Sequence, residues 1–228
     1  MKMFRASMLC AAAIAASVAL PAYADKNRDD LAKKLLDARE EYQELLNTPD
    51  HEIPEALRRG AKCICVIPHA LKGALGYGAQ SGSGAMSCKN EEGVWSPPSF
   101  VKITGGSVGF QIGAESSDLV LFFMNENGAR SLMTGSKFTL GGKASVAAGP
   151  VGRSGEASTD LKLNAEIYTY SKSKGLFAGV SLEGAHVAAD KEWNATYYGQ
   201  KVSVEDLLFN QKVATVPAEA DAFRKALP

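Results

Sequence analysis

The feature that most constrains the fold of this sequence is a series of short β-branched and aromatic runs, separated by glycines, between residues 61 and 190. Many short runs of this composition are typical of an antiparallel sheet that curls or closes into a barrel. Glycines within the runs, such as Gly109 and Gly179, suit bends and close backbone approach in a curved sheet. The expected strands are 61–67, 74–88, 99–104, 107–115, 118–123, 137–149, 164–171 and 175–189.

Helical patterns flank this β-rich region. Residues 25–47 alternate apolar and charged side chains at helical spacing, which predicts one amphipathic helix that covers the open side of the sheet. Shorter helices are expected at 53–60, 125–134, 192–198, 203–209 and 218–227. The predicted fold class is α+β: a curved or barrel-like antiparallel sheet with the N-terminal amphipathic helix and the C-terminal helices packed on it. We expect one domain over 25–228, made of N-terminal helices (25–60), a β-rich body (61–190) and C-terminal helices (191–228).

Residues 1–24 have the layout of a cleavable signal peptide. Lys2 and Arg5 precede a small-apolar stretch that is too short to span a membrane, and small residues precede the expected cleavage after Ala24. Cys10 raises the alternative of a lipoprotein, but Leu9 is larger than the small residue that lipoprotein processing requires before the cysteine. We therefore expect a periplasmic or secreted protein whose mature form is soluble and not acylated.

The charge balance argues against nucleic-acid binding. The chain has 25 basic and 25 acidic residues, and loss of Lys2 and Arg5 with the signal leaves 23 basic residues and a net charge near −2. Two glycine clusters, 76–78 and 82–84, do not complete a dinucleotide fingerprint, and the Gly135-Ser136-Lys137 segment lacks the spacing of a phosphate-binding loop. The sequence also has no nucleophile elbow and no evident pair of catalytic carboxylates. We expect neither an enzyme nor a cofactor.

The cysteines of the mature chain predict a disulfide. Cys63 and Cys65 leave the same face of an expected strand and cannot easily bond to each other, so Cys88 has to pair with one of them in an oxidising compartment. A thiolate metal site requires four ligands, and His51, His69 and His186 show no ligand spacing. We therefore expect no metal.

Five motifs in order carry a resemblance to a known family. The motifs are Ala61-Lys62-Cys63 with Ile67-Pro68 and Lys72-Gly73, then Trp95-Ser96-Pro97-Pro98-Ser99-Phe100, and the segments 105–115, 147–153 and 168–184. With these motifs the sequence resembles the SYLF family, which includes yeast actin-patch proteins and animal phosphoinositide-binding adaptors.

The resemblance implies binding to anionic phospholipid or phosphoinositide-like head groups, and in some eukaryotic members to actin filaments. Actin is not expected as a partner of an exported bacterial chain. The resemblance also selects Cys63 and Cys88 for the disulfide, with Cys65 as a buried thiol. The sequence departs from lipid-binding members because an acid-rich helix replaces their basic amphipathic segment.

Basic residues in the matching motifs are the candidate head-group ligands. Lys172 and Lys174 belong to an expected turn and should project together into solvent, and Arg153 follows a turn that could present its guanidinium to a phosphate. Trp95 is a candidate membrane anchor, although it could instead plug one end of a barrel. The proposed set is Lys72, Arg153, Lys172 and Lys174, with Lys137 and Lys143 nearby. The alternative function is a structural or interaction protein of the cell envelope without a specific lipid ligand.

Overall fold

A computed structural model describes residues 19–47, 53–131, 138–142, 144–150, 165–173 and 176–228. The helices are α1 (Ala19–Leu46), α2 (Glu55–Gly60), α3 (Glu126–Ser131), α5 (Lys191–Tyr198), α6 (Val204–Leu208) and α7 (Ala218–Lys225). The strands are β1 (Cys63–Cys88), β2 (Ser99–Phe123), β3 (Phe138–Thr139), β4 (Val146–Ala148), β5 (Ile167–Ser173), β6 (Leu176–Gly179) and β7 (His186–Ala189).

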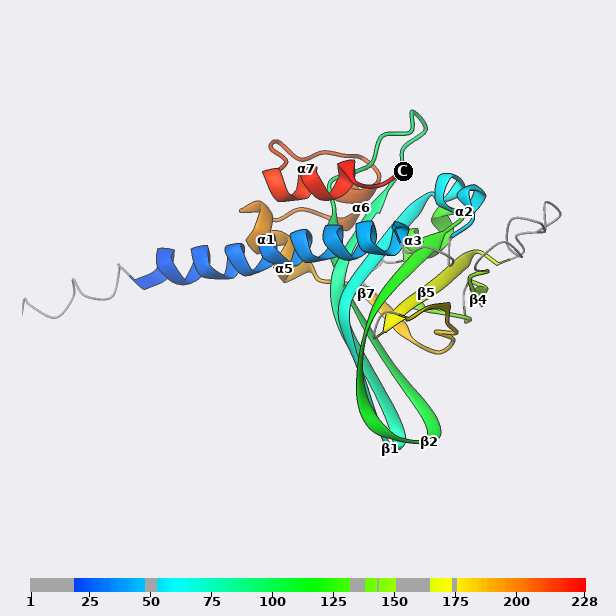
Figure 1. Cartoon of the computed structure of the whole chain (residues 1–228). Helices are drawn as coiled ribbons and strands as arrows, with labels where there is room; N and C mark the ends of the chain where they lie inside the picture. The colour runs from blue at the N-terminus through cyan, green and yellow to red at the C-terminus, as the bar shows by residue number, and fades with distance from the viewer. Residues whose placement is uncertain (1–18, 48–52, 132–137, 143, 151–164, 174–175) are drawn as a thin grey trace, which may run out of the picture.

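The strands form one curled sheet, and its pairings are antiparallel except for that of β4 with β5. Its order is β3-β7-β2-β5-β4, while β1 pairs with β2, and β6 with β5. The N-terminal helix and the C-terminal helices pack against it (Figure 1). The predicted α+β fold with a curved antiparallel sheet is therefore confirmed.

The two long strands β1 and β2 differ from the expected series of short strands. The runs predicted at 61–67 and 74–88 belong to β1, and those at 99–104, 107–115 and 118–123 belong to β2. Glycines between the runs stay inside the ladder, because a glycine lacks a side chain but keeps its backbone donor and acceptor. The two strands pair from Cys63 with Phe123 to Met86 with Ser99, with irregularities between Ile67 and Ala70 and between Leu75 and Tyr77.

The ribbon of β1 and β2 folds back on itself. A straight strand of this length would separate its ends by ~80 Å, yet the Cα atoms of Cys63 and Cys88 lie 4.0 Å apart and their sulfurs are bonded. Figure 1 shows both strands running away from the helices to a distal end and returning. The returning part of β1 packs directly on its outgoing part, since a Cβ on Gly84 would lie 1.9 Å from the Val66 carbonyl oxygen.

Both faces of the sheet are buried. Residues 64 and 66 of β1 and 120 and 122 of β2 pack with α1, α2, α5 and α7, and the alternate residues 63, 65, 67, 119 and 121 pack with α6 on the other face. The apolar stripe of α1 is buried as predicted, through Leu31, Leu35, Ala38, Tyr42 and Leu45. Among the described residues, no helix has the length and apolar character needed to cross a membrane.

Candidate functional site

The predicted disulfide joins Cys63 and Cys88, and Cys65 is a buried free thiol. The three cysteines lie in one apolar cluster on the α6 side of the sheet. Burial raises the pKa of the Cys65 thiol far above its usual range. Cys65 is therefore a packing residue in this structure.

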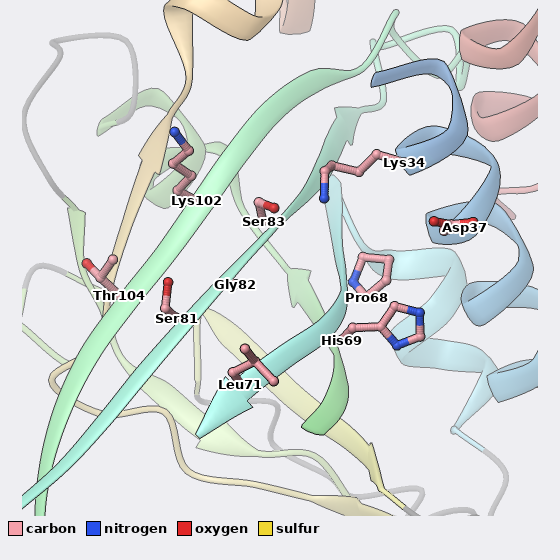
Figure 2. A pocket seen from close by; sticks show the side chains of 10 residues that line it. All are labelled: Lys34, Asp37, Pro68, His69, Leu71, Ser81, Gly82, Ser83, Lys102 and Thr104. Carbon is pink, nitrogen blue, oxygen red and sulfur yellow. The ribbon is translucent and has the colours of Figure 1, made fainter. Parts of the chain in front are cut away.

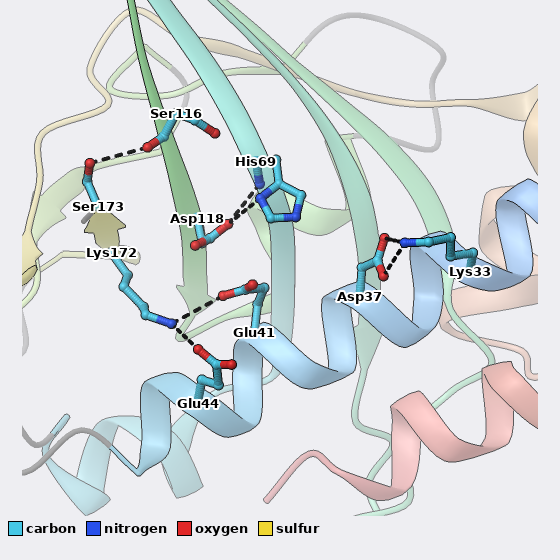
Figure 3. Close-up of polar contacts among 9 residues, drawn as sticks. All are labelled: Lys33, Asp37, Glu41, Glu44, His69, Ser116, Asp118, Lys172 and Ser173. Atoms are coloured by element: carbon cyan, nitrogen blue, oxygen red, sulfur yellow. Dashed lines mark hydrogen bonds and ion pairs between the residues drawn. The ribbon is translucent and has the colours of Figure 1, made fainter. Parts of the chain in front are cut away.

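The sequence predicted that Lys172 projects into solvent, but the structure places it in a largely buried contact with α1. Its side chain is 18% exposed and forms ion pairs with two acidic residues of α1, at 3.5 Å from Glu41 and at close range with Glu44 (Figure 3). Partial burial acts to lower the pKa of Lys172, but hydrogen bonds and charge from Glu44 and Glu41 raise it overall. The difference arises because the acid-rich face of α1 lies over β5, a contact that local turn geometry does not reveal.

The other predicted ligands are not brought together with Lys172. Lys72 is exposed on β1 opposite Glu115 and borders a separate pocket of about 320 Å³. In that pocket the Glu115 carboxylate accepts a hydrogen bond from the Ser173 hydroxyl at 2.7 Å, so a negative charge lies beside Lys72. Arg153, Lys174, Lys137 and Lys143 lie outside the described residues.

Trp95 has little surface to offer as a membrane anchor. Its side chain is 6% exposed, and the indole N–H donates a 2.7 Å hydrogen bond to the carbonyl of Pro228. The ammonium of Lys89 covers the ring at 4.8 Å from its centre. This burial agrees with the alternative of a structural plug, and it ties the loop between β1 and β2 to the last residue of the chain.

A second pocket, which the sequence did not predict, lies where α1 crosses the folded ribbon (Figure 2). Its volume is about 320 Å³, at the lower end of the ~300–1,000 Å³ typical of ligand sites. We call it the α1–ribbon pocket. It is lined by Lys34 and Asp37 of α1, by 68, 69, 71 and 81–83 of β1, and by Lys102 and Thr104 of β2.

The fold-back of β1 builds this pocket. The segments around Pro68 and Ser81 are far apart along the strand but lie side by side, because a Cβ on Gly82 would meet the Ile67 side chain at 2.7 Å. On β2, residues 101 and 103 point into the core, and the alternation places Lys102 and Thr104 on the accessible face. The helical spacing of α1 sets Lys34 beside the fully buried Leu35.

The basic side chains of the α1–ribbon pocket are only partly neutralised. Among the described residues, no carboxylate pairs with Lys34 within 4.0 Å, and its ammonium lies over the Trp193 ring, 5.4 Å from the ring centre. Burial lowers the pKa of Lys34, with Asp37 opposing the shift. Lys102 pairs with Asp190 at 2.5 Å and also lies over Trp193. The pocket thus combines two ammonium groups with the hydroxyls of serine and threonine, which is a donor set suited to an anion.

Asp37 is the acidic residue among those that line the pocket. Its carboxylate accepts hydrogen bonds of 2.8 Å from Lys33, on the outer face of α1 (Figure 3). This pairing offsets its charge. Because Lys102 is paired with Asp190, the ammonium of Lys34 gives the pocket its positive charge. No motif in the sequence marks these two lysines, and only the periodicity of their helix and strand predicts that they are accessible.

A polar cluster lies next to the pocket, between α1, β1, β2 and β5 (Figure 3). We call it the Glu41–Asp118 cluster, and it comprises Glu41, Glu44, His69, Asp118 and Lys172. The His69 N–H donates to Asp118 Oδ1 at 2.8 Å, and His69 has a positive φ of 51° at the irregularity in β1. Burial, followed by the charge of Asp118, raises the pKa of Glu41. The cluster therefore brings two carboxylates close together on the partly buried side of α1.

The sequence is similar to one family model and to animal and yeast proteins with related names. Residues 104–228 match the family model described as "Ysc84: Las17-binding protein actin regulator". The chain is 36% identical over 198 residues to SH3 domain-containing YSC84-like protein 1 of cattle (Bos taurus), covering 86% of this chain and 57% of the relative. It is 37% identical over 190 residues to the human protein of that name, covering 82% of this chain and 55% of the relative.

The similarity extends to yeast. Protein YSC84 of Saccharomyces cerevisiae is 35% identical over 180 residues, which cover 78% of this chain and 38% of the yeast protein. The chain thus spans about half the length, or less, of these relatives. Their names describe binding or regulatory proteins and not enzymes. The motif resemblance, the family model and the extent of identity agree, and the chain belongs to the Ysc84 (SYLF) family.

Proposed function

We propose that this chain is a binding module that recognises the phosphorylated head groups of anionic phospholipids through the α1–ribbon pocket. The observation that carries the proposal is Lys34, a half-buried lysine that faces a pocket and has no carboxylate partner among the described residues. Keeping a charged ammonium partly buried is unfavourable unless an anion compensates it. A phosphate group that enters the pocket would supply that anion.

Two further features support this chemistry. Lys102 adds a second ammonium group, and Ser81, Ser83 and Thr104 add hydroxyl donors around the same pocket. The open wall of the pocket lies between a helix and a ribbon, so a head group attached to a membrane could reach it without entering the core. We prefer this pocket to the patch expected from Lys172 and Lys174 because it contains Lys34, which has no carboxylate within 4.0 Å among the described residues, whereas Lys172 is paired with two acidic residues of α1.

The test is co-sedimentation of the protein with vesicles that contain phosphatidic acid or another anionic phospholipid. The double variant K34Q/K102Q should bind at least ~30-fold more weakly, on the basis of ~1 kcal/mol for each lost basic contact. The matched control is K62Q/K201Q, which removes the same charge from two exposed side chains outside the pocket. Equal losses for K62Q/K201Q and K34Q/K102Q would show a diffuse charge effect and would contradict the assignment of the pocket.

Free phosphate and a lipid head group share the same recognition chemistry. A second part of the experiment distinguishes a site for phosphate groups from other modes of vesicle binding. Inorganic phosphate in millimolar excess should compete with the vesicles if the pocket holds a phosphate, and neutral phosphatidylcholine vesicles should not bind. Binding that is insensitive to both phosphate and K34Q/K102Q would favour the alternative, a structural or interaction protein of the cell envelope without a specific lipid ligand.

The family description raises the question of whether this chain also binds actin. The family description names Las17 binding and actin regulation. We propose that the present chain does not meet actin, because its first 24 residues have the layout of an export signal. Co-sedimentation of the mature chain with actin filaments tests this, and binding of the filaments would contradict it.

A further inference from the structure

Three potential metal ligands from distant parts of the sequence converge within the Glu41–Asp118 cluster. Glu41 of α1, His69 of β1 and Asp118 of β2 each offer one ligand atom, and these atoms all lie within 4.8 Å of one another. Figure 3 shows the imidazole and the two carboxylates at the junction of the helix with the two strands. His69 also lines the α1–ribbon pocket, whereas the proposed anion site depends on Lys34 and Lys102, which are not among these three ligands.

We propose that Glu41, His69 and Asp118 bind a divalent metal ion of the Zn²⁺ type. Imidazole nitrogen and carboxylate oxygen are both ligands of zinc, at ~2.0–2.2 Å from the ion. A tetrahedral ion with such bonds keeps its ligand atoms ~3.4 Å apart. His69 Nδ1 and Asp118 Oδ1 already lie 3.4 Å apart, so one edge of the required triangle is in place, and the Glu41 carboxylate closes it by a small side-chain rotation.

The charges around the cluster also favour a divalent cation. Glu41, Glu44 and Asp118 contribute three carboxylates, and Lys172 pairs with Glu41 and Glu44. When these four groups are ionised, their summed charge is −2, which a divalent ion cancels. Lys172 does not block the site, because a carboxylate has two oxygens and Glu41 can accept from Lys172 with one and bind the ion with the other.

Local structure makes the ligands available to an incoming ion. The Glu41 and Asp118 side chains are each 15% exposed and are held by packing, whereas the His69 side chain is 66% exposed and can rotate onto an ion. Asp118 is oriented by the backbone N–H of His69, which donates to its Oδ1. Three protein ligands leave a fourth position of the ion for water. The ion would join α1 to both strands of the folded ribbon.

The experiment is titration of the mature chain with ZnCl₂ by isothermal calorimetry, without vesicles or phosphate, so that its outcome is independent of the anion site. We expect one ion per chain, a raised thermal midpoint, and a shift of the His69 ring nitrogens in NMR spectra. H69N should weaken binding by roughly 10-fold or more, because losing only an outer-shell partner of a ligand already costs about 10–100-fold in metal affinity. Asparagine tolerates the positive φ at this position, so the variant should fold.

The matched control is H186N. His186 lies on β7 and contacts the Thr139 hydroxyl through Nδ1 at 2.9 Å, away from the cluster, so its loss should not change zinc affinity. D118N is a second variant that keeps an oxygen acceptor for the His69 N–H and should also weaken zinc binding. The proposal is overturned if the chain does not bind Zn²⁺, or if H69N and D118N bind it as tightly as the unmodified protein.

Discussion

At the residue scale, the disulfide between Cys63 and Cys88 leaves Cys65 as the free thiol among the three cysteines of the mature chain. Cys63 and Cys88 are bonded, and Cys65 is buried with a raised pKa, so its reactive thiolate form is scarce. In the chain that begins at Asp25, we predict no reaction of the native protein with a thiol reagent at pH 8, and reaction of the single free thiol after unfolding without reductant. Peptide mapping without reduction should link Cys63 to Cys88. A Cys65–Cys88 peptide, or rapid labelling of the native protein, would contradict the assignment.

At the element scale, the folded ribbon depends on glycine where β1 packs against itself. A Cβ on Gly84 would lie 1.9 Å from the Val66 oxygen and 2.7 Å from the Ile67 Cα, and both of these atoms belong to the backbone. We therefore predict that G84A lowers the free energy of unfolding by about 3 kcal/mol or more, because only a backbone shift relieves the overlap. Urea denaturation followed by circular dichroism measures it. The control is G73A on the same strand, where a Cβ would meet nothing within 4 Å and the change should stay within about 1 kcal/mol. Equal losses for the two variants would mean that β1 does not fold back at Gly84.

At the scale of the whole molecule, we expect that the export signal can be removed without disturbing the packing of the folded body. α1 begins at Ala19, but the first buried side chain described on it is Leu31, so cleavage after Ala24 would remove none of the described core contacts. We predict that the exported protein begins at Asp25 and carries no acyl chain. The intact mass of the protein recovered from the periplasm or medium checks this, and a start at Cys10 with attached fatty acids would refute it. The mature chain should keep the thermal midpoint of the full chain, because the helix stays anchored through Leu31, Leu35 and Tyr42.

The sequence predicted the features that depend on local periodicity. The amphipathic stripe of α1, the strand character of 61–190 and the C-terminal helices follow from apolar spacing, which reflects the faces that an element must bury. The motif series identified the family and, through it, the bonded cysteines. Local patterns did not reveal where the strands end, because the glycines between the short runs continue the ladders of β1 and β2.

Only the tertiary structure decided which side chains meet. The fold-back of β1 joins Cys63 to Cys88, places Ser81 beside Pro68 and forms the wall of the α1–ribbon pocket. The docking of α1 pairs Lys172 with Glu41 and Glu44, which withdraws that lysine from the predicted patch. The same docking collects Glu41, His69 and Asp118, although the histidines showed no ligand spacing along the chain. Such contacts depend on strand register and on the packing of distant segments, and these are set by the free energy of the whole core and not by any local stretch of residues.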